Sequence, residues 1–381
     1  MIIGIDGNEA NVQNRVGIGQ FAFNVINQLS RIDKTNQYTV YLKEAPLPDM
    51  PETSERWKYR IFGPTKAWTQ FALPLTLYLE KDKPSAFYSP SHYAPRFSPV
   101  NTVISIMDLW HHRHPEQFAQ KDLYQLTKWE SYSIRNAKHI ITISEFSKSE
   151  IIKFYKISAD RITVAYPGYS KIKNPAFAKA TAGKQSSKFK IEETMNKFRI
   201  KNKYLIYLGT LQPKKNIERL IGGFSLIAKD NPELSLVIAG KKGWLFETIF
   251  NKTIELGLEK RVIFTGFVSE EEKQNLLTGS EAFVFPSLYE GFGIPVLEAM
   301  DLDVPVVCSK EGSLPEVGGE AAIYCNAYEE SSIAGAIGKV LSLKKSEKDE
   351  IIRKGKNQCK KFSWEKCGQE VLSVLETYAK R

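Results

Sequence analysis

Short apolar runs alternate with segments of helical periodicity through the first 170 residues. The runs end in polar or glycine-containing loops, which is typical of buried strands. They cover residues 2–6, 38–42, 86–88, 102–106, 139–143 and 161–164. Helical spacing appears at 21–29, 116–136 and 145–155, while residues 43–66 hold several prolines and show no period. Strands that alternate with helices predict a parallel, doubly wound sheet.

A second alternation of the same kind starts at residue 204. Its predicted strands are 204–208, 234–239, 262–264, 282–285, 304–308 and 322–324, and its predicted helices are 217–229, 244–256, 270–278, 329–344 and 346–361. Residues 171–190 are rich in Lys, Ala and Ser without a period, so we expect a flexible linker or an insertion there. The predicted domains are 1–170 and 201–361, joined by a linker or insertion at 171–200 and followed by a terminal helix at 362–381. We expect the two domains to face each other across a cleft, a common position for a ligand.

The connection after the strand at 282–285 has the composition of a ligand-binding loop. It continues through Gly291 and Gly293 into a helix that has a proline in its first turn. Unpaired N–H groups at a helix start favour an anion, and glycines let a ligand approach the backbone closely. Glu290 and Glu298 would repel a phosphate unless they accept hydrogen bonds from hydroxyls, such as those of a sugar. The stretch suits a ligand with phosphate and sugar parts; an ordinary turn with two solvated glutamates is the alternative.

Composition narrows the class of protein. The chain has 381 residues, of which 42% are hydrophobic and 25% charged, as in a soluble globular protein of two domains. No apolar run approaches the ~20 residues of a membrane span, and the N-terminus lacks the pattern of a signal peptide. The four cysteines form no CxxC pair, so neither a disulfide framework nor a zinc site is expected, and a reducing cytoplasm fits. The net charge of +10 favours anionic partners such as nucleotides, nucleic acid or an acidic membrane face, or serves solubility alone.

Several motifs in a fixed order carry a resemblance to a known family. They include GIGQF, MDLW, ITISEFSKSEIIKFYKI, YLGTLQPKKNIERLI, FPSLYEGFGIPVLEAM and FSWEKC. The pattern resembles the retaining glycosyltransferases of family four, which have the α/β GT-B fold of two Rossmann-like domains facing across a cleft. Within that family it looks most like the bacterial mannosyltransferases of surface polysaccharide synthesis. The resemblance implies a terminal helix that returns to the N-terminal domain and front-face attack without a carboxylate nucleophile.

The resemblance also implies the co-substrates. A nucleotide-sugar donor, with GDP-mannose as the first expectation, would give its sugar to a glycan or lipid-linked acceptor without a metal cofactor. Glu298 would hydrogen-bond the donor ribose, and Glu290 would contact the hydroxyls of the transferred sugar. Backbone N–H groups near Phe292, Gly293 and Ile294 would serve the sugar and the diphosphate.

The lysine loop matches the diphosphate-binding loop of the family. Lys215, with Lys214 beside it, would stabilise the negative charge that builds on the leaving diphosphate. The loop begins at Gly209, and Thr210 stands where many members have an arginine. Lys214 would compensate for that arginine, and its ammonium would offer the phosphate a point charge in place of a bidentate contact. The remaining donor-side matches are Phe267 and Val268 at the base, and Gly17 and Gly19 in the loop that closes over the phosphates.

The acceptor side departs from the family pattern. Many members have a histidine directly before the aspartate of the MDLW motif, where this chain has Met107 before Asp108. Either the role of that histidine is lost, or His111 or His112 takes it over, and the sequence leaves both open. Asp108 is either an acceptor-side base or a turn residue at a strand end. No further ligand spacing supports a metal site, so residues 111–114 are expected to form a solvated loop.

Two other classes of function remain. A sugar-nucleotide epimerase or a phosphorylase would share the architecture, and a non-catalytic protein that binds nucleic acid or membrane would share the charge. The sequence shows no recognition helix or aromatic single-strand platform, so nucleic acid is not an expected partner. Peripheral contact with the acidic inner face of the cytoplasmic membrane is compatible with lipid-linked acceptors.

Two further polar motifs are predicted to have no role in binding. Asp301 and Asp303 form a DxD sequence but are predicted to lie in a turn, and Lys241 and Lys242 are predicted to be surface charges.

Overall fold

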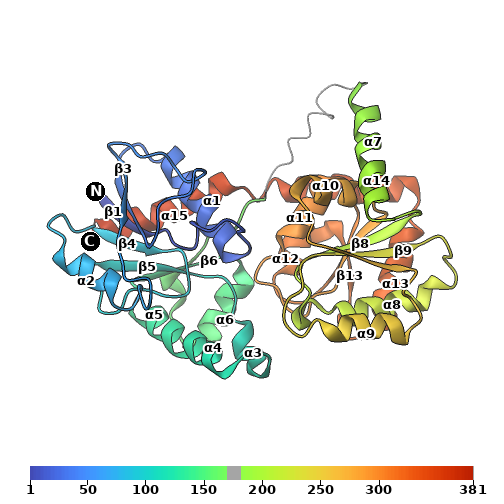
Figure 1. The fold of residues 1–381 in the computed structure, drawn as a ribbon, viewed down its shortest axis with the longest axis horizontal. Coiled ribbons are helices and arrows are strands. Elements are labelled where there is room, and N and C mark those ends of the chain that lie inside the picture. Colours follow the sequence, from blue (N-terminus) through green and yellow to red (C-terminus); the bar gives the residue numbers. More distant parts are fainter. Residues whose placement is uncertain (170–181, 381) are drawn as a thin grey trace. The chain divides into compact units, whose positions relative to one another are not determined.

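The computed structural model describes residues 1–169 and 182–380, which form two compact α/β units. Unit 1 comprises residues 1–168 together with the C-terminal segment that starts at Phe362. Unit 2 runs from Tyr169 to Lys361. Each unit is built around its own parallel sheet, so the predicted doubly wound sheets are confirmed (Figure 1).

Unit 1 contains seven parallel strands in the order β3-β2-β1-β4-β5-β6-β7. They are β1 Ile2–Asp6, β2 Gln37–Leu42, β3 Trp57–Ile61, β4 Ala86–Ser89, β5 Asn101–Ile106, β6 His139–Thr142 and β7 Ile162–Val164. The chain moves outward from β1 to β3 on one side and from β4 to β7 on the other. The order therefore reverses between β1 and β4, and in open α/β sheets ligands bind beyond the carboxyl ends of the strands at such a point.

The helices of unit 1 flank its sheet. They are α1 Ile18–Ile32, α2 Ala72–Leu79, α3 Trp110–Arg113, α4 Gln120–Tyr124, α5 Glu130–Asn136, α6 Glu145–Tyr155 and α15 Trp364–Ala379. The terminal helix α15 packs against α1 closely enough that a Cβ added to Gly368 would lie 2.6 Å from the Cβ of Gln28. The hydroxyl of Tyr378 near the end of α15 lies 3.0 Å from Nδ1 of His139.

Three parts of unit 1 differ from the sequence-based expectation. Strand β3 lies at the edge of the sheet and is largely solvated, so it lacks an apolar run. Helix α2 is apolar on its buried and on its exposed side, so it shows no period. The helix expected at 116–136 starts later, at Gln120, after a 3-10 turn at Pro115–Gln117, and continues to Asn136 as α4, a π-helical turn at Gln125–Trp129 and α5.

Unit 2 contains six parallel strands in the order β10-β9-β8-β11-β12-β13. They are β8 Tyr204–Leu208, β9 Ser235–Ala239, β10 Val262–Gly266, β11 Ala282–Phe285, β12 Val306–Ser309 and β13 Ala322–Cys325. The helices are α7 Ala182–Lys197, α8 Ile217–Ala228, α9 Glu247–Glu255, α10 Glu270–Thr278, α11 Ile294–Asp301, α12 Leu314–Gly318, α13 Glu330–Leu341 and α14 Lys345–Cys359. The strand order reverses between β8 and β11, which places a second ligand-binding point at the carboxyl ends of these two strands.

The predicted linker at 171–200 divides into two parts. Residues 170–181 lie outside the described residues. From Ala182 the chain forms α7, which packs on α10 through a 2.7 Å ion pair between Lys190 and Glu271, so this part is an ordered helix of unit 2. None of the described helices combines the length and the apolar character that crossing a lipid bilayer requires.

Candidate active site

Two loops meet at the carboxyl ends of β8 and β11 in unit 2, where the strand order reverses. The lysine loop leads from β8 to α8, and the glycine-rich loop leads from β11 to α11. Asn216 joins them, since its Nδ2 donates to the carbonyl oxygens of Pro286 at 2.9 Å and of Ala327 at 2.6 Å. The backbone N–H of Leu288 donates to the carbonyl of Lys214 at 2.8 Å. These bonds fix one loop against the other.

Lys215 and Glu290 form an ion pair across the two loops. Lys215 Nζ lies 2.5 Å from Glu290 Oε1, with side-chain exposures of only 14% and 9%. The ammonium also lies 5.1 Å from the centre of the Phe285 ring, within the range of a cation–π contact. The sequence assigned the lysine to a diphosphate and the glutamate to a sugar. The structure brings both side chains to one place, each neutralising the charge of the other.

The loop that carries Glu290 is shaped by its neighbours. Ser313 Oγ donates to the carbonyl oxygens of Glu290 and Phe292 at 3.0 and 2.7 Å. Gly293 has a φ of 109°, in the left-handed region, and a Cβ there would lie 2.8 Å from Cδ2 of Leu314. Because this N-cap residue is a glycine, it has no side chain to cap α11. At this helix start Pro295 has no N–H and the N–H of Val296 donates to the carbonyl of Gly293, so the backbone N–H of Ile294 is the group suited to bind an anion.

Glu298 lies on α11 and is held by a residue that the sequence did not indicate. Lys273 Nζ on α10 donates to Glu298 Oε1 at 2.8 Å and lies 2.8 Å from Glu270 Oε2. Burial by itself would lower the pKa of Lys273, but the carboxylates of Glu298 and Glu270 outweigh it and raise the pKa above its ordinary value. Lys273 therefore remains charged and orients the carboxylate that was predicted to bind a ribose.

Two buried hydroxyls near these loops have no hydrogen-bond partner among the described residues. They are Tyr207 OH at the end of β8 and Ser287 Oγ after β11. Burial and the Glu290 charge raise the pKa of Tyr207 well above its ordinary value, so the phenol stays neutral. A Cβ on Gly209 would lie 2.8 Å from this hydroxyl, which explains why a glycine follows the strand. Buried polar atoms without a partner are a feature of sites that a ligand or water completes.

The other predicted donor-side residues occupy different places. Thr210 is half-buried in the lysine loop, whereas Phe267, directly after β10 at the sheet edge, is 73% exposed and Val268 is half-buried. Gly17 and Gly19 lie in unit 1, where Gly17 is the N-cap of α1 with a φ of 50°. A Cβ on Gly19 would lie 2.9 Å from the carbonyl oxygen of Glu9.

The remaining polar motifs of unit 2 have local structural roles. Asp303, at a φ of 62°, lies in the predicted turn after α11 and pairs with Lys356 at 3.1 Å. Lys241 and Lys242 are exposed, as predicted, and Lys242 Nζ lies 4.7 Å from the centre of the Phe246 ring.

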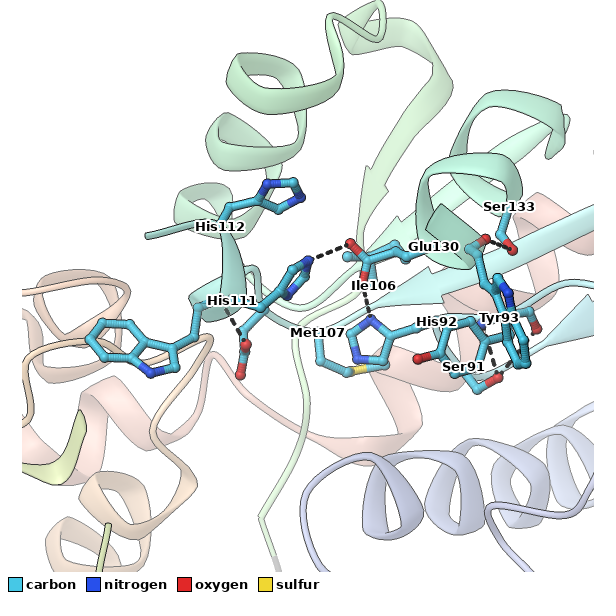
Figure 2. Close-up of polar contacts among 12 residues, drawn as sticks. Ser91, His92, Tyr93, Ile106, Met107, His111, His112, Glu130 and Ser133 are labelled. Atoms are coloured by element: carbon cyan, nitrogen blue, oxygen red, sulfur yellow. Dashed lines mark hydrogen bonds and ion pairs between the residues drawn. The ribbon is translucent and has the colours of Figure 1, made fainter. Parts of the chain in front are cut away.

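Glu130 is the centre of a buried polar cluster in unit 1 (Figure 2). His92 Nδ1 lies 2.8 Å from Glu130 Oε2, and His111 Nε2 lies 3.4 Å from Oε1. The hydroxyl of Tyr155 donates to Oε1 at 2.7 Å and lies 2.7 Å from Nε2 of His112. Burial alone would raise the pKa of Glu130, but the contacts with His111 and His92 overcome it and lower the pKa to about 2. This fully buried carboxylate is therefore ionised.

The structure places the predicted acceptor-side residues in a short helix and a turn. The solvated loop expected at 111–114 is wrong, because these residues form α3 and the following turn, and His111 is 3% exposed. Asp108 Oδ1 accepts from the N–H of Trp110 at 3.2 Å, which is the contact of a turn residue at a strand end. His111, His112 and Glu130 each place one ligand atom within 4.8 Å of the others, close enough to surround a cation. That carboxylate, however, already accepts the Tyr155 hydroxyl.

Comparisons with known proteins cover both units. The family described as "Glycosyltransferase Family 4" matches residues 16–170, and the one described as "Glycosyl transferases group 1" matches residues 190–358. "O-antigen chain mannosyltransferase B" of Escherichia coli is 30% identical over 323 residues, which is 84% of this chain and 79% of that protein. "O-antigen chain mannosyltransferase RfbU" of Salmonella typhimurium is 28% identical over 64% of this chain and 62% of its own length.

Solved structures share the fold at low sequence identity. Anabaena Alr3699/HepE, crystallised with UDP-glucose, has a TM-score of 0.72 and 17% identity, with 99% of each chain covered. WaaG, described as a glycosyltransferase of lipopolysaccharide biosynthesis, has a TM-score of 0.69 and 12% identity, with 98% of this chain and 99% of that chain covered. These neighbours confirm the GT-B fold. With both units matched and a relative 30% identical across most of both proteins, the chain belongs to the group 1, family 4 glycosyltransferases and is a sugar-transferring enzyme.

Proposed function

We propose that this enzyme transfers mannose from GDP-mannose, with retention of configuration, to a glycan or lipid-linked acceptor. The observation that carries the donor site is the Lys215–Glu290 pair at the point where the strand order of unit 2 reverses. The relatives in E. coli and Salmonella are named as mannosyltransferases of the O-antigen chain, which supports the choice of sugar and the polysaccharide pathway. The HepE structure holds UDP-glucose on the same fold, which supports a nucleotide-sugar donor.

The two members of the ion pair would each take a different part of the donor in the proposed reaction. As the bond from the sugar to the diphosphate breaks, negative charge builds on the phosphate oxygens. Lys215 exchanges its contact with Glu290 for the diphosphate, and the N–H of Ile294 at the start of α11 adds to its effect. Glu290 is then released to accept hydrogen bonds from the sugar hydroxyls. Donors that act on developing charge in this way are each worth about 2.7–4 kcal/mol.

A donor panel tests this proposal. The purified protein is incubated with radiolabelled GDP-mannose, UDP-glucose and UDP-N-acetylglucosamine, with and without octyl α-mannoside as acceptor. We expect GDP release and a labelled glycoside with GDP-mannose only. Conversion of the donor without the acceptor into another nucleotide sugar would indicate an epimerase, and a sugar 1-phosphate formed with inorganic phosphate would indicate a phosphorylase. If none of these donors binds or reacts, the proposal fails.

We further propose that unit 1 contacts an acidic membrane surface from the cytoplasmic side through helix α2. Ala72, Leu73 and Leu77 of this helix are buried against the core. Its other side carries an exposed apolar stripe, which consists of Phe71, Leu75, Tyr78 and Leu79. Residues spaced in this way share one face of a helix, and exposed Lys66, Lys81 and Lys83 flank it in the sequence. An exposed apolar helix face with flanking lysines fits the interface of an anionic bilayer.

Replacing Leu79 with glutamate should weaken binding to anionic vesicles at least about tenfold. Leu79 is 72% exposed, so the change leaves the core intact while it removes apolar area that would enter the bilayer. Co-sedimentation with phosphatidylglycerol–phosphatidylethanolamine vesicles measures the effect. Ile254→Glu is the matched control, since Ile254 is 62% exposed on a helix of unit 2. Equal loss of binding in both variants, or in neither, would contradict the assignment to α2.

A further inference from the structure

His92 lies where the strand order of unit 1 reverses. It follows the last residue of β4, Ser89, by three positions, and β4 pairs with β1 on one side and β5 on the other. Ligands of open α/β sheets bind beyond the carboxyl ends of the strands at such a point. No motif in the sequence indicates this residue.

Several contacts fix the loop that carries His92 (Figure 2). Nδ1 lies 2.8 Å from the carboxylate of Glu130 on α5. One turn further along α5, Ser133 Oγ accepts from the N–H of Ala94 at 2.9 Å. The hydroxyl of Ser89 donates to the carbonyl of Tyr93 at 2.6 Å. The imidazole is thus held from α5 and from the end of its own strand, and it is not free to rotate as a surface side chain would be.

The contact with Glu130 also sets the proton position on the imidazole. The ionised carboxylate lies 2.8 Å from Nδ1, as a close ion-pair contact without hydrogen-bond geometry, and its negative charge favours the neutral tautomer with the proton on Nδ1 and the lone pair on Nε2. The side chain retains 20% exposure. Within the part of the chain that the structure describes, no hydrogen bond involves Nε2. Nε2 is therefore an oriented hydrogen-bond acceptor.

The charges around His92 determine the kind of ligand. Carboxylates act on it from three elements: Glu130 on α5, Asp108 after β5 and Glu9 after β1. Burial alone would lower the pKa of His92, but the Glu130 contact, with Asp108 and Glu9, outweighs it and raises the pKa. Three carboxylates disfavour a phosphate or another anion. A neutral polyol, whose hydroxyls can donate to Nε2 and to carboxylates, fits this environment.

We infer that His92 binds a hydroxyl group of the acceptor sugar through Nε2, and that Glu130 is the positioning residue that fixes the imidazole. The inference rests on the proposed function, because that hydroxyl belongs to the acceptor of the proposed reaction. It assigns unit 1 an acceptor-binding residue on a different loop from the histidines at 111 and 112.

Acceptor kinetics test the inference. With GDP-mannose as donor, KM for octyl α-mannoside is measured between pH 5.5 and 9 for the wild type and for His92→Ala, His92→Gln and Glu130→Gln. We expect His92→Ala to raise KM about tenfold or more while the affinity for GDP changes less than about twofold. In the wild type, KM should rise as the pH falls through the pKa of His92, because an imidazolium cannot accept a hydrogen bond. Glu130→Gln should move that rise to lower pH, because it removes the carboxylate that raises this pKa, and His92→Gln should abolish it.

The outcomes separate this inference from the proposed function. An unchanged KM in His92→Ala, or an unchanged pH profile in Glu130→Gln, overturns the inference while transfer by the wild type still supports the function. If the wild type transfers no sugar, NMR still tests the inference. The pKa values of the five histidines are then measured with and without octyl α-mannoside. A lowered pKa of His92 supports the binding role, and an unchanged one refutes it. Loss of mannoside binding on chelation that Zn²⁺ restores would assign Glu130 to a cation and overturn its positioning role.

Discussion

Replacing Lys215 with methionine should lower the rate of sugar transfer by about 10²–10³-fold. The ammonium forms the ion pair with Glu290 that joins the lysine loop to the glycine-rich loop, and it is the positive charge that can stabilise a leaving diphosphate. Methionine keeps much of the length and apolar surface of lysine while it removes the charge. Steady-state kinetics with GDP-mannose measures the effect, and transfer at the wild-type rate would refute the role of Lys215.

A double-mutant cycle separates the catalytic from the structural effect of this pair. Lys215→Met leaves the Glu290 carboxylate, which is 9% exposed, without its cation, and breaking a buried pair costs about 3–5 kcal/mol of stability. Adding Glu290→Gln removes the orphaned charge, so the double variant should recover much of that stability. It should not recover activity. If activity returns together with stability, the pair is structural and the donor site lies elsewhere.

Replacing Asn216 with alanine should lower the free energy of unfolding of unit 2 by at least about 3 kcal/mol. Two buried carbonyl oxygens, of Pro286 and Ala327, would lose their donor, at about 1–3 kcal/mol each. Asn216 also has a φ of 60°, a conformation that costs alanine about 1–2 kcal/mol. Urea unfolding followed by tryptophan fluorescence measures the loss.

Asn216→Gly is the matched control for this prediction. Glycine adopts the left-handed conformation without strain but supplies no side-chain donor, so it should recover only about 1 kcal/mol of the loss. Full recovery with glycine would show that the backbone conformation, and not the two hydrogen bonds, sets the stability. A change below about 0.5 kcal/mol for alanine would show that the two loops are held by other contacts.

Most of the fold could be predicted from the sequence because buried parallel strands consist of continuous apolar runs. Tyr204–Leu208 and Ala282–Phe285 are buried along their whole length, and both were expected as strands. The failures have local causes. Strand β3 is a solvated edge, and the second apolar face of α2 removes the contrast on which a helical period depends. The helix that ends at Asn136 contains a π-helical turn before Glu130, and such a turn has no clear sequence signal.

The candidate site could be predicted only where its residues lie in local motifs. Lys215 and Glu290 follow strands in recognisable loops, but their direct contact depends on the pairing of β8 with β11. Lys273 reaches Glu298 from another helix, and no nearby residue indicates this contact. Because position 107 is a methionine, the sequence offers His111 and His112 as the nearest histidines that could replace the expected one. The better-placed imidazole is on the loop after β4, and only the fold brings it to Glu130.

The anomeric configuration of the product tests the central claim most directly. GDP-mannose carries an α-linked sugar, and the proposed reaction retains that configuration. After incubation of the enzyme with GDP-mannose and octyl α-mannoside, the one-bond carbon–proton coupling at the new anomeric centre is measured by NMR. We predict an α-linked mannosyl product that does not form with Lys215→Met. A β-linked product, or hydrolysis without any glycoside, would contradict the account.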